Sequence, residues 1–332
     1  MGDLTAIDES EVARAVDVLR GGGLVALPTE TVYGLGADAS DDDAVRRVFA
    51  VKGRPADHPL IVHIADVERL DDWAADVPST ARRLAAAFWP GPLTLLLWRG
   101  PNVSDVVTGG RPTIAVRVPD HPLALAVLRA FGGGIAAPSA NRFGKVSPTT
   151  AAHVRSDLGD DVDLVLDGGP CTVGVESTIV DLTGPRPVVL RVGAITAERL
   201  TDVLAEPVLV HGGDAAPSAS GGALAPGMLA SHYAPEARVH LVDVDEVDEV
   251  LVALLAADEG LVALLAPTVL PGVPDGVVEL EPAGPPEEYA AVLYARLRQA
   301  DRLGVRHLVC VAPPAEGIGL AVVDRLRRAA AH

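Results

Sequence analysis

A segment rich in glycine, alanine, serine and proline divides the chain and limits what it can fold into. Residues 211–235 read HGGDAAPSASGGALAPGMLASHYAP, which has no helical or strand period and is typical of a linker. The chain has 332 residues, more than one hydrophobic core usually supports, and its apolar fraction of 49% is sufficient for two cores. We therefore expect one domain at 8–204, a linker at 205–236 and a second domain at 237–332.

Strand-like and helix-like runs alternate on the N-terminal side of this linker. The strand-like runs are LVALPT, PLIVHI, LTLLLW, TIAVRV, IAAPS, VDLVLD and STIVDL, and the helix-like runs are DDDAVRRVFAVKG, PSTARRLAAAFW, HPLALAVLRAFG and TTAAHVRSDLG. Such alternation predicts an α/β domain. Because several strands follow one another without a helix, we expect a mixed rather than a purely parallel sheet. A first helix should be capped by Ser10 and run to about Arg20.

The C-terminal side of the linker has a similar but smaller pattern. ARVHLVD, GLVALLA and VRHLVCVA read as strands, and DEVDEVLVALLAA, PEEYAAVLYARLRQADRLG and GIGLAVVDRLRRAAA read as helices. Strands spaced by helices of this length predict a Rossmann-like α/β domain. The dinucleotide-binding pattern GxGxxG is absent from it, so no dinucleotide site is predicted there.

The charge balance limits the classes of ligand. The net charge is −18, which repels a phosphate backbone, and aromatic residues are 3%, too few for a base-stacking surface. Extended nucleic-acid binding would need a locally basic groove, so direct binding of a nucleic acid should be weak or absent. A small anionic ligand is easier to accommodate.

Several features favour a soluble protein of the reducing cytoplasm. Cys171 and Cys310 lie far apart and form no CxxC or Cys/His cluster, so neither a disulfide framework nor a structural zinc site is indicated. The beginning MGDLTAIDES is acidic and unlike a secretory signal. The longest apolar stretch, at 251–270, is interrupted by Asp258, Glu259 and Gly260, which argues against a membrane span.

Lysine usage points to a possible anion site. Only two lysines occur beside 25 arginines, and both fall in segments rich in glycine, proline, serine and asparagine. Lys52 stands in VKGRPADHPL and Lys145 in PSANRFGKVSPTT. A lysine offers a compact, mobile charge where an arginine offers a planar fork, so retention of lysine at these two positions favours phosphate binding. Chance remains the competing explanation.

Other polar residues stand at turns and strand ends, where open α/β sheets place their ligands. Each segment alone is also explained by a tight turn, a capping hydroxyl or a solvated basic loop. Besides Lys145, they supply four cations at turns and strands, Lys52, Arg54, Arg117 and Arg191, and at least five hydroxyls. This inventory suits a nucleoside triphosphate and a small zwitterion better than a hydrolase. Motifs of P-loop NTPases, kinases, zinc proteases and nucleophile-elbow hydrolases are absent. The residues are Thr29, Glu30, Thr31, Lys52, Arg54, His63, Thr113, Arg117, Ser139, Asn141, Lys145, Ser147, Ser177 and Arg191.

The order of these motifs resembles one known family. GGLVALPTETVYGLG, KGRPADHPLIVHI, FWPGPLTLLL, TIAVRVPDHP, APSANRFGKVSPT, VGVESTIVD, VLRVGAI and PGMLASHYAP resemble the two-domain L-threonylcarbamoyladenylate synthases, whose first domain has the YrdC-like fold. The resemblance covers about residues 8–200, the linker, and the C-terminal LGVRHLVCVA and GIGLAVVDRLRRAA. It implies a YrdC-like twisted mixed sheet with flanking helices, followed by the smaller Rossmann-like domain.

The resemblance also implies a reaction and its participants. L-threonine, bicarbonate or CO₂, and ATP would give threonylcarbamoyl-AMP and pyrophosphate, with Mg²⁺ as the expected cofactor. The product would pass to a tRNA threonylcarbamoyl-transferase that modifies an adenosine next to the anticodon. The mobile linker would close over the nucleotide as a lid.

The resemblance assigns roles to individual residues. Lys52, Arg54 and Asn141 belong to a signature formed by KGR and SAN and are expected near the phosphates. L-threonine is expected at Thr31, His63, Arg117, Ala137 and Ser177. ATP is expected at Arg54, His58, Thr113, Ser139, Ser147, Arg191 and Tyr233. The residues that would hold the metal ion are unknown from the sequence.

Two positions depart from the family pattern, and two other readings remain open. Many relatives carry Asn where His58 stands, and Asp324 replaces a frequent Asn. A double-stranded RNA or tRNA-binding module without catalysis is the alternative from another class, which the net charge of −18 opposes. A second alternative is carbamoyl transfer in metallocentre maturation. The lack of zinc-finger cysteines in this sequence counts against it.

Overall fold

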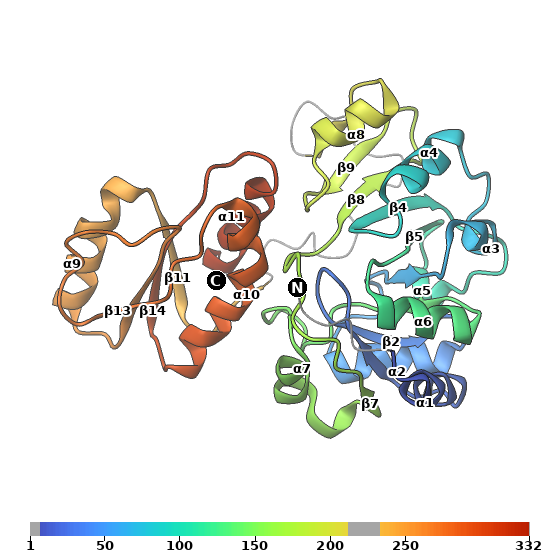
Figure 1. Cartoon of the computed structure of the whole chain (residues 1–332), viewed down its shortest axis with the longest axis horizontal. Helices are drawn as coiled ribbons and strands as arrows, with labels where there is room; N and C mark the ends of the chain where they lie inside the picture. Colours follow the sequence, from blue (N-terminus) through green and yellow to red (C-terminus); the bar gives the residue numbers. More distant parts are fainter. Residues whose placement is uncertain (1–6, 212–232, 332) are drawn as a thin grey trace.

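The computed structural model describes residues 7–211 and 233–331, which form two β-sheets with helices packed on each (Figure 1). The N-terminal sheet has the strand order β10-β9-β8-β4-β5-β3-β6-β2-β1-β7. Its strands are β1 (Val25–Leu27), β2 (Gly34–Asp38), β3 (Ile61–His63), β4 (Leu93–Trp98), β5 (Thr113–Arg117), β6 (Ile135–Ala136), β7 (Leu164–Val165), β8 (Thr178–Asp181), β9 (Val188–Arg191) and β10 (Leu209–Val210).

This sheet is mixed, as the succession of strands without helices predicted. The pairs β3/β5 and β4/β8 are parallel, whereas β4/β5, β3/β6 and β8/β9 are antiparallel. The accompanying helices are α1 (Glu9–Arg20), α2 (Asp42–Lys52), α3 (Leu70–Trp73), α4 (Ser79–Phe88), α5 (Asp105–Thr108), α6 (Pro122–Phe131), α7 (Ala151–Leu158) and α8 (Ala197–Leu204). The predicted α/β class of the first domain is therefore confirmed.

Two helix ends illustrate the local sequence control. The expected cap of α1 was wrong: Asp8 is the N-cap, and its carboxylate accepts from the amide and the hydroxyl of Ser10 at 2.8 and 2.7 Å. An ionised carboxylate at the positive end of the helix is a stronger acceptor than a hydroxyl. Helix α2 ends where Gly53 adopts φ 63°, which leaves Lys52 as its last residue and turns the chain toward Arg54.

The C-terminal sheet is parallel and has the order β11-β14-β12-β13. Figure 1 shows α10 and α11 on the side of this sheet that faces the N-terminal domain, with α9 on the other side. The Rossmann-like expectation is confirmed. The elements are β11 (Arg238–Val242), α9 (Val247–Ala257), β12 (Val262–Leu265), β13 (Val277–Glu279), α10 (Pro286–Arg302), β14 (His307–Val311) and α11 (Gly319–Ala330).

The two domains share one apolar cluster. Val32, Val146 and Val175 of the first domain pack with Tyr289 and Leu297 of α10. The burial of these side chains in a common core opposes free swivelling of the domains, because separation would expose all of them to water. The second domain is thus held close to the strand ends of the first.

The predicted linker at 205–236 is only partly covered by the described residues. Its beginning includes β10, which pairs in parallel with β9, so the chain is still part of the first sheet at Val210. Its end includes Ala234, whose amide donates to the Gly144 carbonyl at 3.1 Å. The predicted lid falls mainly on 212–232, outside the described residues.

None of the helices in the described part of the chain has the length and apolar character needed to cross a bilayer. Cys171 and Cys310 are both free thiols, and both are buried.

Candidate active site

A cavity of about 590 Å³, including its open mouth, lies at the strand ends of the first domain. Nine of the predicted residues line it, and Thr29, Val32, Gly34, Ile61, Pro138 and Glu176 complete the lining. The nine predicted residues are Thr31, Arg54, His63, Arg117, Ala137, Ser139, Ser177, Arg191 and Tyr233.

Strand register explains why residues far apart in the sequence meet here. In the parallel pair β3/β5, His63 lies opposite Arg117, so both side chains stand at the carboxyl ends of their strands. Arg191 ends β9 and lies opposite Ile179 of the antiparallel neighbour β8, just beyond Ser177. The strand-end position that open α/β sheets use for ligands therefore collects a hydroxyl, an imidazole and two guanidinium groups.

Arg117 forms the first polar cluster of the cavity. Its Nε donates to the Gly91 carbonyl at 3.1 Å, Nη1 to Thr31 Oγ1 at 2.9 Å and Nη2 to Glu30 Oε1 at 2.5 Å. The side chains of Arg117 and Glu30 are only 4% and 6% exposed. The guanidinium is thereby fixed in orientation before any ligand arrives, and Glu30 Oε2 is buried without a hydrogen-bond partner among the described residues.

His63 supplies a neutral imidazole beside this cluster. Burial and the neighbouring charge of Arg117 lower the pKa of His63 to about 3. Its Nδ1 is buried and has no hydrogen-bond partner among the described residues. A neutral ring can both accept and donate a hydrogen bond, which suits a polar, uncharged part of a ligand.

We expect the His63 imidazole to stay uncharged throughout the physiological pH range. Its folded-state pKa of about 3 lies below the ordinary value of 6.5, so the unfolded chain binds the proton first. This residue therefore contributes stability at neutral pH that is lost as the pH falls from 6.5 toward 3. Imidazole NMR resonances, assigned with a His63→Gln variant, measure the titration. A His63 midpoint near 6.5 in the folded protein would contradict the expectation.

Ser177 and Arg191 form the second polar cluster. Arg191 Nε donates to the Ser177 carbonyl and Nη2 to Ser177 Oγ, both at 3.0 Å. The Ser177 hydroxyl also lies 2.8 Å from Thr94 Oγ1 of strand β4. Three strands, β4, β8 and β9, thus fix the position of one hydroxyl and one cation.

Glu176 is the functional candidate that sequence reasoning missed. Its Oε1 accepts from Ser147 Oγ at 2.7 Å, and its Oε2 accepts from Tyr294 OH at 2.7 Å and from Arg325 Nε at 3.0 Å. Burial would raise the pKa of Glu176, but the charges of Arg325 and Arg191 outweigh burial and hold it at about 2. The segment VESTIVD contains this glutamate, yet its partners lie far away in the sequence and nothing local indicates them.

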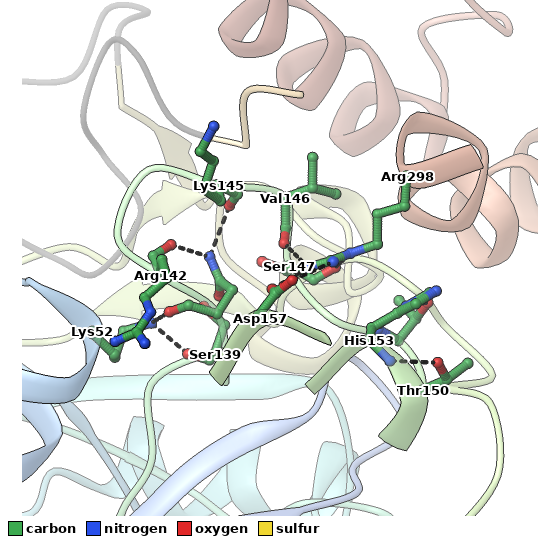
Figure 2. Close-up of polar contacts among 12 residues, drawn as sticks. Lys52, Ser139, Arg142, Lys145, Val146, Ser147, Thr150, His153, Asp157 and Arg298 are labelled. Carbon is green, nitrogen blue, oxygen red and sulfur yellow. Dashed lines mark hydrogen bonds and ion pairs between the residues drawn. The ribbon is translucent and has the colours of Figure 1, made fainter. Parts of the chain in front are cut away.

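Arg54 and Lys52 behave differently although they are two residues apart. Arg54 lines the cavity, donates from Nη2 to the Pro59 carbonyl at 3.0 Å and lies 5.9 Å from the Phe143 ring centroid. Lys52 is outside the lining, and its Nζ donates to the Ser139 and Asn141 carbonyls at 2.5 and 2.6 Å (Figure 2). Burial lowers the pKa of Lys52, while the two carbonyl oxygens favour its charged form.

The other predicted residues also lie outside the cavity lining. Asn141 Nδ2 donates to the Arg142 and Lys145 carbonyls at 2.8 Å each, which holds the loop after β6 in shape. Ser147 is fully buried beneath Glu176. Thr113 is the first residue of β5, at the opposite end of the strand from Arg117. The His58 and Phe143 rings meet edge to face, with 5.5 Å between their centroids. The side chain of Lys145 extends away from Lys52 and Ser139 (Figure 2).

Fold and site together define an α/β protein with a strand-end cavity lined by cations and hydroxyls, a lining that suits an anionic or zwitterionic ligand. The Sua5/YciO/YrdC family model, described as "Telomere recombination", matches residues 17–193, and the model described as "Threonylcarbamoyl-AMP synthase, C-terminal domain" matches residues 195–331. The chain belongs to the Sua5/YciO/YrdC family of threonylcarbamoyl-AMP synthases.

Similarity to individual relatives extends over nearly the whole chain. The threonylcarbamoyl-AMP synthase of Pyrococcus abyssi is 42% identical, covering 98% of this chain and 96% of the relative. That of Bacillus subtilis is 41% identical, covering 99% and 95%. The crystal structure of P. abyssi Sua5 complexed with L-threonine is 42% identical, with a TM-score of 0.89, and the match covers 98% of this chain and 95% of that one.

Proposed function

We propose that this chain joins L-threonine, a carbonate species and ATP to form threonylcarbamoyl-AMP and pyrophosphate. The class of activity, threonylcarbamoyl-AMP synthesis, follows from full-length similarity to two curated synthases. The observation that carries the proposal is a single cavity in which the Arg117 cluster and the Ser177–Arg191 cluster flank a neutral imidazole, His63. One cluster suits a carboxylate and a hydroxyl, and the other suits phosphates.

L-threonine is assigned to the Arg117 side of the cavity. Arg117 would balance the charge of the substrate carboxylate, although all three of its nitrogens already have protein partners, so a carboxylate would share or displace one of them. Thr31 and Ser177 offer hydroxyls, and His63 offers a neutral nitrogen, for the substrate's hydroxyl and amine. Ala137 would contribute backbone to this part of the site.

ATP is assigned to the side formed by Arg54, Ser139, Arg191 and Tyr233. Lys52 would act through the carbonyls that it holds, keeping Ser139 in place. The threonine amine would take up CO₂ as a carbamate, whose oxygen attacks the α-phosphorus while pyrophosphate leaves. Fixed cations would stabilise the charge on the phosphoryl oxygens, and positioning would supply much of the remaining acceleration.

Four predicted residues lie outside the cavity lining and would support or border the ATP side of the site. They are Ser147, Asn141, Thr113 and His58. Because Ser147 donates its proton to Glu176, its oxygen can only accept from a ligand. A contact with ATP would then involve an amino or hydroxyl group of the nucleotide rather than a phosphate.

Mg²⁺ is proposed to enter with ATP. Among residues 7–211 and 233–331, no group of three or more His, Cys, Asp or Glu side chains could hold a metal ion. This fits an ion held mainly by phosphates and water, as Mg²⁺ often is. When bound it would neutralise part of the phosphoryl charge.

The product is proposed to be handed to a separate transferase. A mixed carbamic–phosphoric anhydride hydrolyses readily in water, so a second enzyme must accept it and transfer the threonylcarbamoyl group to adenosine in tRNA. The net charge of −18 opposes tight tRNA binding by this chain itself.

Pyrophosphate release tests the proposed function directly. With ATP, Mg²⁺, bicarbonate and L-threonine we expect release that stops when threonine or bicarbonate is omitted. L-serine, which lacks one methyl group, should be used less efficiently, by roughly 10-fold or more. Release at the same rate without threonine would reject the proposal.

A further inference from the structure

Arg325 of helix α11 is a charged residue with no exposed surface, although it belongs to the C-terminal domain. Its Nη1 donates to its neighbour Asp324 at 2.7 Å. Its other two nitrogens reach into the first domain, Nε to Glu176 Oε2 and Nη2 to the Val192 carbonyl, each at 3.0 Å. One buried side chain thus connects the second domain to two segments of the first, one just before β8 and one just after β9.

The two contacted residues flank the second polar cluster of the cavity. Glu176 immediately precedes Ser177, and Val192 immediately follows Arg191. Arg191 is bonded to Ser177 through both its Nε and its Nη2. Arg325 therefore bridges the chain on both sides of a pair that lines the cavity, and it fixes the separation of the two segments.

Helix α10 and the end of the linker complete the arrangement. Tyr294 OH donates to the same Glu176 oxygen as Arg325 does, at 2.7 Å. The Arg325 guanidinium lies 5.3 Å from the ring centroid of Tyr233, and Tyr233 stacks on Tyr294 with 5.6 Å between centroids. Tyr233 and Glu176 both line the cavity, so the C-terminal domain supports two of its walls.

We propose that Arg325 is a positioning residue of the synthase reaction, acting through Glu176 and Val192 to hold Ser177 and Arg191 in their working arrangement. The C-terminal domain would then complete the active site. This inference rests on the proposed function, because the arrangement in question is that of the proposed threonine and ATP contacts.

The charges around Glu176 indicate what the loss of Arg325 would do. Glu176 is faced by Ser147, by Arg191 of β9, by Tyr294 of α10 and by Arg325 of α11, with Tyr233 close by. Asp324 faces Arg325 and adds negative charge. Without Arg325 the carboxylate keeps Arg191 as its one strong cationic neighbour among the described residues, and the bridge between the segments that carry Ser177 and Arg191 is lost.

Loss of Arg325 should also change the protonation of Glu176. Burial raises the pKa of this carboxyl, and Arg325 and Arg191 together outweigh burial in the native protein. With one of the two cations removed, the pKa of Glu176 should rise toward neutrality. A protonated Glu176 no longer attracts Arg191, so the activity of the variant should fall more steeply with falling pH than that of the native protein, which adds an acid limb to the ratio of the two.

The test compares four full-length proteins by threonine-dependent pyrophosphate release between pH 5.5 and 9. Arg325→Met keeps the apolar volume but removes charge and donors, and kcat/KM for L-threonine should fall roughly 10- to 100-fold with the new acid limb. Arg325→Lys should restore the charge and suppress the limb, but recover the rate only in part. Arg327→Met, on the exposed side of the same helix, is the matched control and should match wild type.

Arg298→Met separates positioning from mere attachment of the domains. Arg298 of α10 also joins the domains, through Asp157 at 2.8 Å, the Val146 carbonyl and the Ser147 carbonyl at 3.4 Å (Figure 2). It does not contact the Glu176 side chain, which binds the Ser147 hydroxyl instead. We expect this variant to lower the melting temperature without adding an acid limb. If Arg325→Met behaves in the same way, or retains wild-type kcat/KM and pH profile, the positioning role is overturned.

Two further measurements keep the outcome unambiguous. Glu176→Gln, alone and combined with Arg325→Met, should show strong non-additivity, because both changes remove the same support. Full additivity would overturn the inference. Calorimetry measures L-threonine binding by the same variants. If wild-type protein shows no threonine-dependent pyrophosphate release, the proposed function is rejected. If Arg325→Met and wild type have equal threonine affinity and equal release, the positioning role alone is rejected.

Discussion

Arg117→Met is expected to reduce threonine-dependent pyrophosphate release by at least about 1,000-fold and to lower the melting temperature as well. The change removes the cation at the proposed threonine site. It also leaves the buried carboxylate of Glu30 without a hydrogen-bond donor among residues 7–211 and 233–331. Breaking one partner of a buried ion pair costs about 3–5 kcal/mol, because the remaining charge stays in a poorly solvating environment. Turnover and thermal unfolding of the same preparation measure the two effects.

A double variant separates catalysis from stability at this position. Arg117→Met combined with Glu30→Gln removes the unpaired charge, so the melting temperature should recover substantially while activity stays low. Recovery of activity together with stability would show that Arg117 serves only to neutralise Glu30. In that case the assignment of threonine to the Arg117 cluster would be wrong.

Lys52→Arg is expected to lower turnover at least about 10-fold although it preserves the charge. Lys52 Nζ lies between two carbonyl oxygens at 2.5 and 2.6 Å, and its side chain is 3% exposed. A planar guanidinium is too large for this position, and overpacking of a buried site costs about 1–3 kcal/mol. The displaced carbonyls belong to Ser139 and Asn141, so the loop that contributes Ser139 to the cavity would shift.

Lys145→Arg is the matched control, since it makes the same chemical change at an exposed residue of the same loop region. We expect it to retain wild-type turnover. Lys52→Met should also be impaired, because two buried carbonyls lose their donor, at about 1–3 kcal/mol for each unsatisfied group. Near-normal turnover of Lys52→Arg would show that neither the fit nor the position of the ammonium matters.

The two lysines show how far local sequence reasoning reaches. The retention of two lysines among 25 arginines singled out both segments. Of the two lysines, Lys52 does adjoin the cavity, because it binds the carbonyl of Ser139. The expected reason was a direct phosphate contact, but Lys52 holds the backbone behind Ser139 instead, and Lys145 extends away from it. Composition can mark a position where an ammonium is required, but the direction of a side chain depends on the helix that carries it.

Glu176 and Arg325 mark the part of the site that sequence reasoning could not reach. They are 149 residues apart and belong to different domains. Each by itself looks ordinary, a glutamate before a strand and one arginine among several on an amphipathic helix. Only the packing of α10 and α11 against the first domain makes a buried ion pair of them.

The sequence by itself determined the α/β class, the mixed and parallel sheets, and most of the polar residues that line the cavity, because strand and helix periods and strand-end motifs are local properties. Tertiary structure decided which residues face the cavity and which support the backbone behind it. It also decided that the second domain contributes Arg325 and Tyr294 to the support of Glu176. Such contacts arise when apolar faces pack and bury the charges between them, and the pairing of those charges is fixed only in the assembled fold.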